Sequence, residues 1–371
     1  MNKVKAMILA AGDGLRIRPL TQDLPKPMIP ILGKPVMEYL VEILAKHGIE
    51  DIMVNVGYKH WRIENHFGNG RLWNVNIGYS YEGVYEYGEI VPRALGSAGG
   101  MRKIQDFGNF FDTTTIVLCG DALIDLDLTA AVLEHKRKKA LASVVTLEVP
   151  HDAVVDYGVV ETDDEGKIIS FQEKPLPEHA RSNFASTGIY IFEPEVLQYI
   201  PHNTEFDIGS QLFPLLVEKG LPFYAQKHTF NWIDIGHVPG YWSVLQRVLQ
   251  GEVKQTHMPG IQVRPGVWVG LNTRIDWDNV KIEGPVYIDS GVCLEAGVEI
   301  IGPTWISWGS YICRNSKIIR SVLFEYTHIP ADMVFNETIV SPSYCVMHQS
   351  GETYYTGDDR CELRWSDARG R

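Results

Sequence analysis

The chain has 371 residues, of which 45% are hydrophobic and 22% charged, so it can form two domains with separate cores. Its net charge of −12 argues against a nucleic-acid-binding surface, and no apolar run is long enough to span a membrane. The apolar N-terminal segment is too short for a signal peptide core. The five cysteines are widely spaced and include no Cys-x-x-Cys pair, which predicts reduced thiols and a cytoplasmic location.

Apolar, β-rich runs alternate with helical patterns through the first 245 residues. Strands are expected at residues 5–11, 51–56, 76–81, 115–119 and 142–149, and helices at residues 36–47 and 128–139. This alternation predicts an α/β fold with a Rossmann-like, mostly parallel sheet that is covered on both faces. Ligands of such sheets bind beyond the carboxyl ends of the strands.

The first strand ends in a glycine-rich turn that reads Leu9-Ala10-Ala11-Gly12-Asp13-Gly14-Leu15-Arg16. Glycines let the backbone approach a ligand, and Arg16 and Lys26 add positive charge where a polyphosphate would lie. Arg18 and Lys34 enlarge this local basic pocket. The turn lacks the Gly-Lys-Ser of a Walker loop and, with Ile17, the third glycine of a dinucleotide fingerprint. The turn predicts a triphosphate-binding enzyme. The alternative is a structural turn between a strand and a helix, in which the glycines only allow the backbone conformation.

Seven further motifs follow the glycine turn in a fixed order. They are Pro25-Lys26-Pro27, Leu95-Gly96-Ser97-Ala98-Gly99, Gly120-Asp121, Tyr157-Gly158-Val159-Val160, Glu173-Lys174-Pro175, Thr187-Gly188-Ile189-Tyr190 and Trp232-Ile233-Asp234-Ile235-Gly236. Together these motifs resemble the sugar-1-phosphate nucleotidylyltransferases, or nucleotide-sugar pyrophosphorylases, over about residues 4–245. The chain is most similar to the cyanobacterial-type UDP-glucose pyrophosphorylases, which resemble mannose-1-phosphate guanylyltransferases in layout.

The resemblance implies transfer of a nucleotidyl group from a nucleoside triphosphate to a sugar 1-phosphate, with release of pyrophosphate. UTP and glucose 1-phosphate, giving UDP-glucose, are the favoured substrates. The implied cofactor is Mg²⁺, held by Asp121 and Asp234, each of which follows an apolar run. Arg16, Lys26 and Asp121 are the implied catalytic residues, because the reaction needs neutralised phosphate charge more than acid–base chemistry.

The resemblance also implies two sets of substrate-binding residues. Those for the nucleotide are Leu9, Ala10, Ala11, Gly12, Gly14, Arg16, Gly96 and Ser97. Those for the sugar phosphate are Gly158, Glu173, Lys174, Ser186 and Trp232. The chain departs from its relatives at two positions, since Ser186 stands where asparagine is usual and His237 where threonine is common.

Alternatives remain open at this point. One is GTP with mannose 1-phosphate, although Ala11 favours a uridylyl or thymidylyl enzyme and residues 91–94 lack the acidic residue of mannose-1-phosphate enzymes. Another is a catalytically silent subunit that binds nucleotide sugars. Taken alone, Asp121 could be a turn acid with Asp125 and Asp127 as rivals, and Lys174 a solvated surface lysine. We expect no membrane or nucleic-acid partner and leave a homo-oligomer open.

From about residue 265 apolar residues recur every six positions. The series is Ile282, Ile288, Leu294, Ile300, Ile306, Ile312, Ile318 and Phe324. A period of six predicts a short parallel β-helix, and the family resemblance implies that it is left-handed. The expected organisation is a nucleotidyltransferase domain at 1–250, a hexapeptide-repeat β-helix at 260–340 and a tail at 341–371, whose tyrosines and tryptophan would cover the coil. An acyltransferase alternative for the β-helix would depend on His328, and the coil is short for it.

Overall fold

The computed structural model describes residues 3–86, 89–253 and 256–370 of the chain. These residues form two compact units. The first comprises Met1–Gly14, Leu24–Met28 and Met37–Trp232, and the second comprises Leu15–Asp23, Ile29–Val36 and Ile233–Arg371, in each case as far as they are described. None of the helices in this part of the chain has the length and apolar character needed to cross a membrane.

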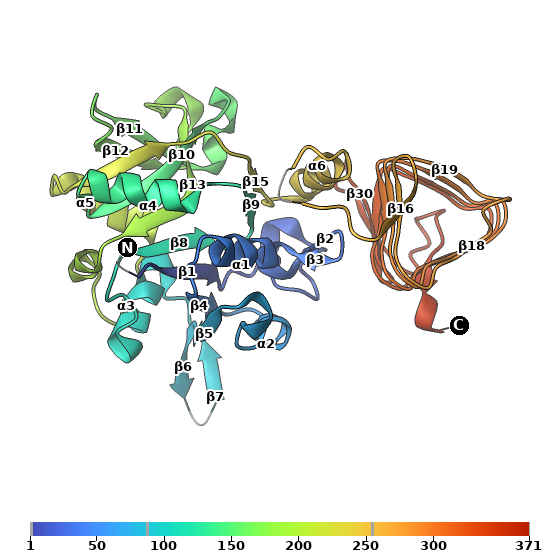
Figure 1. Ribbon diagram of the computed structural model, residues 1–371, viewed down its shortest axis with the longest axis horizontal. Helices are drawn as coiled ribbons and strands as arrows, with labels where there is room; N and C mark the ends of the chain where they lie inside the picture. The colour runs from blue at the N-terminus through green and yellow to red at the C-terminus, as the bar shows by residue number, and fades with distance from the viewer. Residues whose placement is uncertain (1–2, 87–88, 254–255, 371) are drawn as a thin grey trace. The chain divides into compact units, whose positions relative to one another are not determined.

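A mixed, nine-stranded sheet forms the centre of the first unit (Figure 1). Its strands are β1 (Lys5–Ala10), β4 (Asp51–Val56), β5 (Asn76–Tyr81), β8 (Thr115–Cys119), β10 (Ala142–Glu148), β11 (Gly158–Thr162), β12 (Ile168–Glu173), β13 (Phe184–Phe192) and β14 (Phe223–Lys227). The order is β12-β11-β13-β8-β1-β4-β5, with β10 paired to β13 and β14. Strands β8, β1, β4 and β5 are parallel, whereas β13 runs antiparallel to β8 and β10. The predicted α/β fold with a Rossmann-like sheet is confirmed.

Helices cover both faces of this sheet and build two apolar cores. Side chains of α1 (Val36–Lys46), α2 (His60–Phe67) and α4 (Leu128–Arg137) pack with Ala6 and Ile8 of β1. Those of α3 (Gly96–Gly108) and α5 (Phe213–Glu218) pack with Met7 on the opposite face. Alternate residues of one strand therefore point into different cores, as expected for a sheet buried on both sides.

Shorter elements connect these strands and helices. The short strands are β2 (Pro30–Ile31), β3 (Lys34–Pro35), β6 (Gly83–Glu86), β7 (Glu89–Pro92), β9 (Ala122–Ile124) and β15 (Trp232–Asp234). The 3₁₀ helices are Leu15–Ile17, Lys26–Met28, Arg71–Trp73, His151–Asp156, Pro177–His179, Pro194–Tyr199 and Ala368–Gly370, and a π-helix spans Ile208–Leu212.

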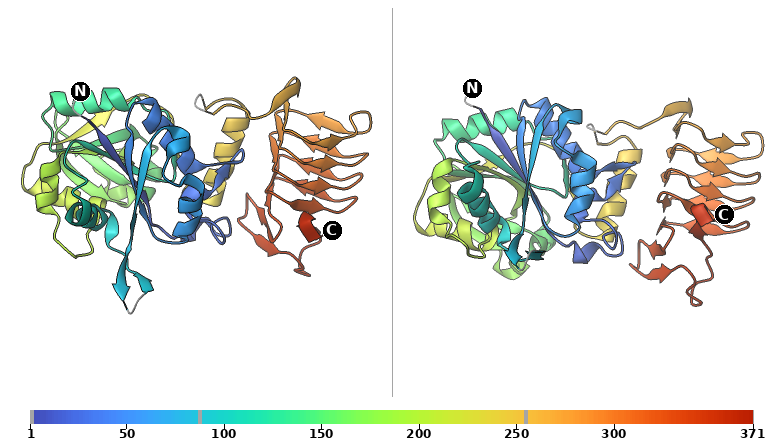
Figure 2. Two further views of the ribbon diagram at one scale, coloured as in Figure 1. Left: turned by 60° about the horizontal axis from the view of Figure 1, so that its bottom comes forward. Right: turned by 90° about the horizontal axis from the view of Figure 1, so that it is seen from below.

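The second unit contains α6 (Val238–Leu249) and a parallel β-helix, whose coils are seen edge-on in Figure 2. The coil strands are β16 (Ile261–Arg264), β17 (Val267–Val269), β18 (Arg274–Ile275), β19 (Lys281–Glu283), β20 (Val286–Ile288), β21 (Cys293–Leu294), β22 (Glu299–Ile301), β23 (Thr304–Ile306), β24 (Tyr311–Ile312), β25 (Lys317–Ile319), β26 (Val322–Leu323), β27 (Thr327–Ile329), β28 (Val334–Asn336) and β29 (Thr338–Val340). They form three sheets, in which Ile282 pairs with Ile300 and Ile300 with Ile318, 18 residues apart. One coil thus consists of three six-residue repeats, and the predicted period of six is observed.

The last predicted position of the six-residue ladder is wrong. Leu323, not Phe324, pairs with Ile306, 17 residues earlier, and is fully buried in the core of the coil. The chain turns the preceding corner through Arg320, whose φ is 41°, with one residue fewer than the period requires. Phe324 is displaced outward, where its ring lies 6.1 Å from that of Trp305.

The C-terminal tail is ordered and packs on the β-helix. Its strand β30 (Tyr344–Met347) pairs antiparallel with β29, and β31 (Thr353–Tyr355) pairs antiparallel with β30. Strand β32 (Ser366–Asp367) pairs antiparallel with β27. Trp365 and Cys361 are buried in the core of the coil, and Tyr354 packs against it. The tail therefore covers apolar surface of the coil, as expected for its aromatic residues.

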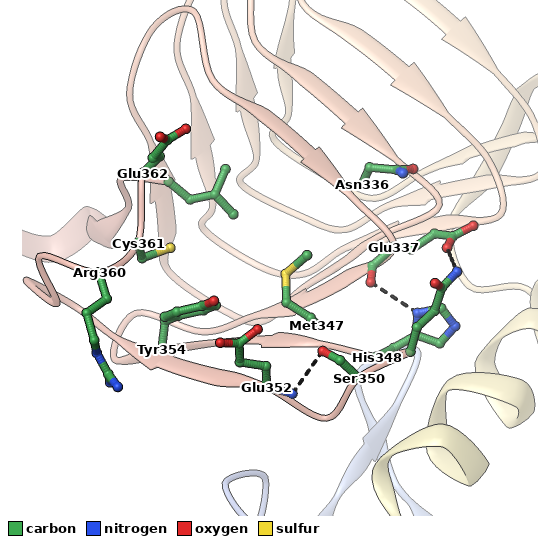
Figure 3. A pocket seen from close by; sticks show the side chains of 12 residues that line it. Asn336, Glu337, Met347, His348, Ser350, Glu352, Tyr354, Arg360, Cys361 and Glu362 are labelled. Carbon is green, nitrogen blue, oxygen red and sulfur yellow. Dashed lines mark hydrogen bonds between the residues drawn. The ribbon is translucent and has the colours of Figure 1, made fainter.

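A pocket of about 520 Å³ lies between the tail and the last coil (Figure 3). Met347, Tyr354 and Cys361 contribute apolar surface to it, and carboxylates, among them Glu337 and Glu352, line it as well. No residue that the sequence predicts for substrate or metal binding lines this pocket.

Candidate active site

The carboxyl ends of three neighbouring parallel strands meet at one edge of the sheet. β1 pairs with β4 and with β8, so that Leu9 lies level with Asn55 and Cys119. The N–H of Gly120 donates a hydrogen bond to the carbonyl oxygen of Leu9 at 2.9 Å, and a Cβ at position 120 would lie 2.8 Å from that oxygen. Glycine is therefore required there, and it holds Asp121 directly beside the end of β1.

The turn after β1 leaves open space at Gly12. A Cβ added at Gly12 would meet no described atom within 4 Å beyond its chain neighbours, whereas one at Gly57 would lie 2.7 Å from the carbonyl oxygen of Ala11. Gly14 has a φ of 63°, a left-handed conformation that glycine adopts without strain. The main chain at Gly12 thus has room for a ligand, as a phosphate-binding turn needs.

Lys26 and Asp121 form an ion pair at this edge of the sheet. Lys26 begins a short 3₁₀ helix, and its ammonium group donates a hydrogen bond to the carboxylate of Asp121. The two side chains are only 14% and 23% exposed, so salt and water screen the pair less than a surface pair. Two of the three residues predicted to be catalytic therefore lie together.

The N-terminus of α3 holds a neighbouring loop. A Cβ at Gly96, whose φ is +70°, would lie 2.7 Å from the carbonyl oxygen of Phe206. The hydroxyl of Ser97 donates to Oδ2 of Asp207 at 2.7 Å and accepts from the main-chain N–H of Ile208 at 2.8 Å. Gly96 and Ser97 therefore fix the loop at 206–208, a role that the sequence motifs do not reveal.

Asp207 is a residue of this region that the motifs miss. The main-chain N–H and the hydroxyl of Ser210 donate to its carboxylate at 2.8 and 3.1 Å, in addition to Ser97. Burial raises the pKa of Asp207, but these hydrogen bonds outweigh burial and hold the pKa below its usual value. Asp207 is a helix N-cap, since its carboxylate accepts the N–H three residues later; an Asp directly before a helix could have been recognised in the sequence as a cap, but not as a neighbour of Ser97.

Two glycines make room for the carboxylate of Glu173 at the end of β12. A Cβ at Gly209 would lie 2.6 Å from Oε2 of Glu173, and one at Gly158 would lie 3.0 Å from the same oxygen. Burial raises the pKa of Glu173, while the charge of Lys174 lowers it and that of Asp207 raises it. Gly158, Glu173 and Lys174, predicted together for the sugar phosphate, are thus brought together with a second carboxylate.

Lys174 has a backbone conformation that lysine seldom adopts. Its φ is 47°, and its N–H donates to the carbonyl oxygen of Tyr157 at 3.1 Å. The ammonium group lies 3.9 Å from Oε1 of Glu173, and the side chain is 48% exposed. This left-handed turn thus carries an accessible ammonium group next to the carboxylate of Glu173.

One of the predicted sugar-binding residues has a buried polar atom without a hydrogen-bond partner among the described residues. This atom is Nε1 of Trp232, the first residue of β15, whereas the hydroxyl of Ser186, in β13, interacts with Tyr190. The indole ring of Trp232 packs against the ring of Tyr157 at a centroid distance of 5.0 Å. Because buried polar groups are rarely left unpaired, Nε1 of Trp232 is a candidate for binding a substrate hydroxyl group.

Arg16 and Asp234 belong to the second unit, and their place beside Asp121 remains a prediction. Arg16 is the middle residue of the 3₁₀ helix Leu15–Ile17, and Asp234 is the last residue of β15. His237 is the N-cap of α6, where its Nδ1 accepts a main-chain hydrogen bond at 2.9 Å. Histidine here performs a capping role that threonine can also perform, which accounts for this departure from the relatives.

His328, on which an acyltransferase site would depend, is in contact with neighbouring side chains. Its Nδ1 lies 2.9 Å from Oγ of Ser366 in the tail, and its Nε2 lies 3.4 Å from Sγ of Cys313. These contacts link the coil to β32, and they give His328 a structural role.

Comparison with known proteins identifies the family of the chain. The model of the nucleotidyl transferase family matches residues 5–251. The UTP–glucose-1-phosphate uridylyltransferase of Synechocystis sp. is 53% identical over 343 residues, which cover 92% of this chain and 88% of that protein. A glucose-1-phosphate adenylyltransferase of Bacillus cytotoxicus is 28% identical over 92% of both chains.

A solved structure has the same fold over much of the chain. The crystal structure of a UDP-glucose pyrophosphorylase complexed with UDP-glucose superposes with a TM-score of 0.57 at 23% identity, over 68% of this chain and 100% of that one. The family model covers more than half of the chain, and the shared architecture and the Synechocystis relative agree with it. The chain therefore belongs to the nucleotidyl transferase family.

Proposed function

We propose that the protein converts UTP and glucose 1-phosphate into UDP-glucose and pyrophosphate. The observation that carries this proposal is the 53% identity to the Synechocystis UTP–glucose-1-phosphate uridylyltransferase over 92% of the chain. The described cysteines are all free thiols, which is consistent with the cytoplasmic location predicted from their spacing.

The proposed reaction is an in-line displacement at the α-phosphorus of UTP. A phosphate oxygen of glucose 1-phosphate forms a bond to this phosphorus, and the bond from the phosphorus to the oxygen that bridges to the β-phosphate breaks. The electron pair of that bond leaves with pyrophosphate. Because the nucleophile is already anionic, the protein must mainly neutralise the crowded phosphates and hold the two substrates in line.

Lys26 and Arg16 are proposed to supply the positive charge for this step. The ammonium group of Lys26 already lies against a carboxylate, Asp121, at the strand edge where the triphosphate is expected to bind. A guanidinium such as that of Arg16 suits phosphate because its planar fork donates two parallel hydrogen bonds. Binding of the triphosphate would draw Lys26 from the carboxylate toward the phosphates.

The chemistry of the aspartates suits Mg²⁺. No three His, Cys, Asp or Glu side chains among the described residues gather as a metal site of their own. Mg²⁺ uses one or two carboxylates and completes its octahedron with phosphate oxygens and water, so Asp121 and Asp234 are sufficient as its proposed protein ligands. When bound, the ion would supply further positive charge to the triphosphate.

The sugar phosphate is proposed to bind in the first unit around Glu173 and Lys174. The ammonium group of Lys174 would bind the phosphate, and the carboxylate of Glu173 would accept hydrogen bonds from sugar hydroxyl groups. The hydroxyl of Ser186 and the unpaired Nε1 of Trp232 would bind the same sugar. Gly158 would contribute the space that Glu173 occupies.

The nucleotide is proposed to bind along the turn after β1 and the N-terminus of α3. The open main chain at Gly12 would face the phosphates, and Gly14 would give the turn its left-handed bend. Main-chain and small side-chain groups would contact the base and ribose; these groups are provided by Leu9, Ala10, Ala11, Gly96 and Ser97.

Pyrophosphate release by the purified chain tests the proposal. Four triphosphates would be paired with common sugar 1-phosphates, each with Mg²⁺ and with a chelator. We expect the highest rate with UTP and glucose 1-phosphate and loss of that rate with the chelator. Equal or faster turnover of GTP with mannose 1-phosphate would refute the uridylyl assignment. Binding of UDP-glucose without turnover of any pair would show a silent nucleotide-sugar-binding subunit.

A further inference from the structure

Three aspartates follow β8 within seven residues, and the structure gives each a different set of partners. Asp121 receives a hydrogen bond from Lys26. Asp127 is the N-cap of α4, where its carboxylate accepts the N–H of Ala130 at 2.9 Å. Asp125 does neither, although it was a rival of Asp121 in the sequence.

Asp125 is joined to Asn231 by three hydrogen bonds. Its Oδ1 accepts the main-chain N–H of Asn231, and its Oδ2 accepts from the side-chain amide of Asn231 at 2.6 Å. The N–H of Asp125 in turn donates to the carbonyl oxygen of Asn231 at 3.2 Å. The two residues are 106 positions apart, so the contact ties the segment after β9 to the start of β15.

This contact fixes the residue directly before Trp232. With the main chain of Asn231 held on both its N–H and its carbonyl group, the peptide that leads into Trp232 has little freedom. The indole is then held from the side by the ring of Tyr157, and its Nε1 has no hydrogen-bond partner. A residue whose polar atom awaits a ligand must be oriented by groups other than that atom, and Asp125 supplies the constraint on the main chain.

We propose that Asp125 is a positioning residue for sugar-phosphate binding, which acts by holding Asn231 and thereby the indole of Trp232. The inference rests on the proposed function only in taking Trp232 as a sugar-binding residue. The carboxylate of Asp125 has no metal or phosphate to bind in this role. The positions of its hydrogen-bonding atoms therefore matter, and its charge does not. This separates it from Asp121, whose charge is required by the proposed metal site.

Two substitutions at position 125 separate shape from charge. In Asp125→Asn, the oxygen of the new side-chain amide would accept the main-chain N–H of Asn231. Its NH₂ group would donate to the side-chain oxygen of Asn231, whose own amide can turn over. Asp125→Ala removes both side-chain hydrogen bonds. Asp121→Asn is the matched control, because it removes a charge with the same change of atoms four residues away.

The experiment uses the full chain and measures kcat, KM for each substrate, the melting temperature, and the fluorescence change on adding UDP-glucose. Subtracting the signal of Trp232→Phe isolates the contribution of this one indole. We expect Asp125→Ala to raise KM for glucose 1-phosphate roughly tenfold or more and to reduce the Trp232 signal, with KM for UTP changed by no more than about twofold. We expect Asp125→Asn to stay within about twofold of the wild type in every parameter, unlike Asp121→Asn.

Two results would overturn the proposal. One is Asp125→Asn losing as much activity as Asp121→Asn, which would show that the charge at position 125 is used. The other is Asp125→Ala with an unchanged KM for the sugar phosphate and an unchanged Trp232 signal. Should the wild type prefer another triphosphate and sugar 1-phosphate, the same comparison on that pair decides the role of Asp125 independently of the substrate assignment.

Discussion

The ion pair between Lys26 and Asp121 is the feature at the residue scale on which catalysis most depends in the proposed mechanism. Replacing Asp121 with Asn removes one charge from the proposed metal site and weakens the partner of Lys26. We expect kcat to fall by roughly a hundredfold or more with the fold retained, because charge-assisted contacts to metal and phosphate are lost. Steady-state kinetics together with circular dichroism measure both quantities. Turnover close to that of the wild type would remove Asp121 from the metal site.

Lys174 permits a test that separates its side chain from its strained backbone. Both Lys174→Ala and Lys174→Gly remove the ammonium group, but only glycine is relaxed at a φ of 47°. We expect both variants to raise KM for glucose 1-phosphate by roughly ten- to hundredfold, the value of a charge-assisted bond to phosphate. The glycine variant should have the higher melting temperature of the two. If KM for the sugar phosphate stays unchanged in both, Lys174 is a surface lysine.

Glu173 should make stability and sugar binding respond to pH in opposite ways. Burial raises its pKa, so the folded state binds the proton more tightly than the unfolded chain. The ionised carboxylate of Glu173 therefore destabilises the folded state. This destabilisation is absent below the ordinary pKa of glutamate, near 4.3, and develops as the pH rises through the raised pKa. We expect Glu173→Gln to melt at a higher temperature than the wild type at pH 8 and at the same temperature near pH 4.

The same substitution should weaken sugar-phosphate binding, because the amide cannot accept as many hydrogen bonds as the carboxylate. In the wild type, affinity for glucose 1-phosphate should fall on acidification at a higher pH than for an ordinary carboxylate. Melting curves and KM measured across the pH range provide the data. If the melting temperatures of the wild type and Glu173→Gln differ by the same amount at every pH, the raised pKa of Glu173 is contradicted.

Site residues that lie within a short sequence motif were identified from the sequence, and site residues without such a motif were not. Lys26 and Asp121 lie in short motifs, and the structure brings them together. Asp207 was missed because its neighbours form no such motif, and its importance depends on Ser97, 110 positions away, and on Glu173. Asp125 was named only as a rival, since nothing in its local sequence reveals Asn231 as its partner.

At the scale of elements, local patterns located the strands well and their pairing less well. The strands expected at 51–56, 76–81 and 115–119 have these bounds in the structure, because each is a continuous apolar or alternating run. The antiparallel strands β11, β12 and β13 were not predicted as strands; β11 and β12 form a local hairpin, whereas β13 pairs with β8, a strand far from it in the sequence. The ladder of the β-helix failed only at Phe324, where a single residue is missing from one corner.

The π-helix Ile208–Leu212, directly before α5, offers a test of how an element shapes the site. A methyl group at position 209 would lie 2.6 Å from Oε2 of Glu173, so Gly209→Ala must displace that carboxylate. We expect a loss of affinity for the sugar phosphate of roughly tenfold, because one charged hydrogen-bond acceptor is misplaced. Gly108→Ala, where an added Cβ meets nothing within 4 Å, is the matched control and should behave as the wild type in the same kinetic assay. Equal affinity in both variants would show that Glu173 does not contact the sugar.

At the scale of the whole molecule, the second unit combines two short N-terminal segments, Leu15–Asp23 and Ile29–Val36, with the C-terminal part of the chain from Ile233 onward. The hydroxyl of Tyr241, in α6, donates to the carbonyl oxygen of Pro30 at 2.6 Å. The ring of Tyr241 lies 6.3 Å from that of Phe324, and the ring of Trp242 lies 4.5 Å from that of His348. The change of period near residue 265 shows where the local repeat begins, but it cannot show that α6 packs with the coil and the tail.

These contacts predict that the β-helix is structural. Deleting residues 260–371 removes Phe324 and His348 and leaves the rings of Tyr241 and Trp242 without these partners. Since about 1 kcal/mol shifts the melting temperature by roughly 2–4 °C in domains of about 150–250 residues, loss of this packing should lower the midpoint by a few degrees or drive association through the exposed face. Deleting only residues 341–371, which removes β30, β31 and β32 but keeps Phe324, should have a smaller effect. A shortened protein with unchanged melting temperature and unchanged size by light scattering would show that the β-helix has no structural role and that an activity should be sought there.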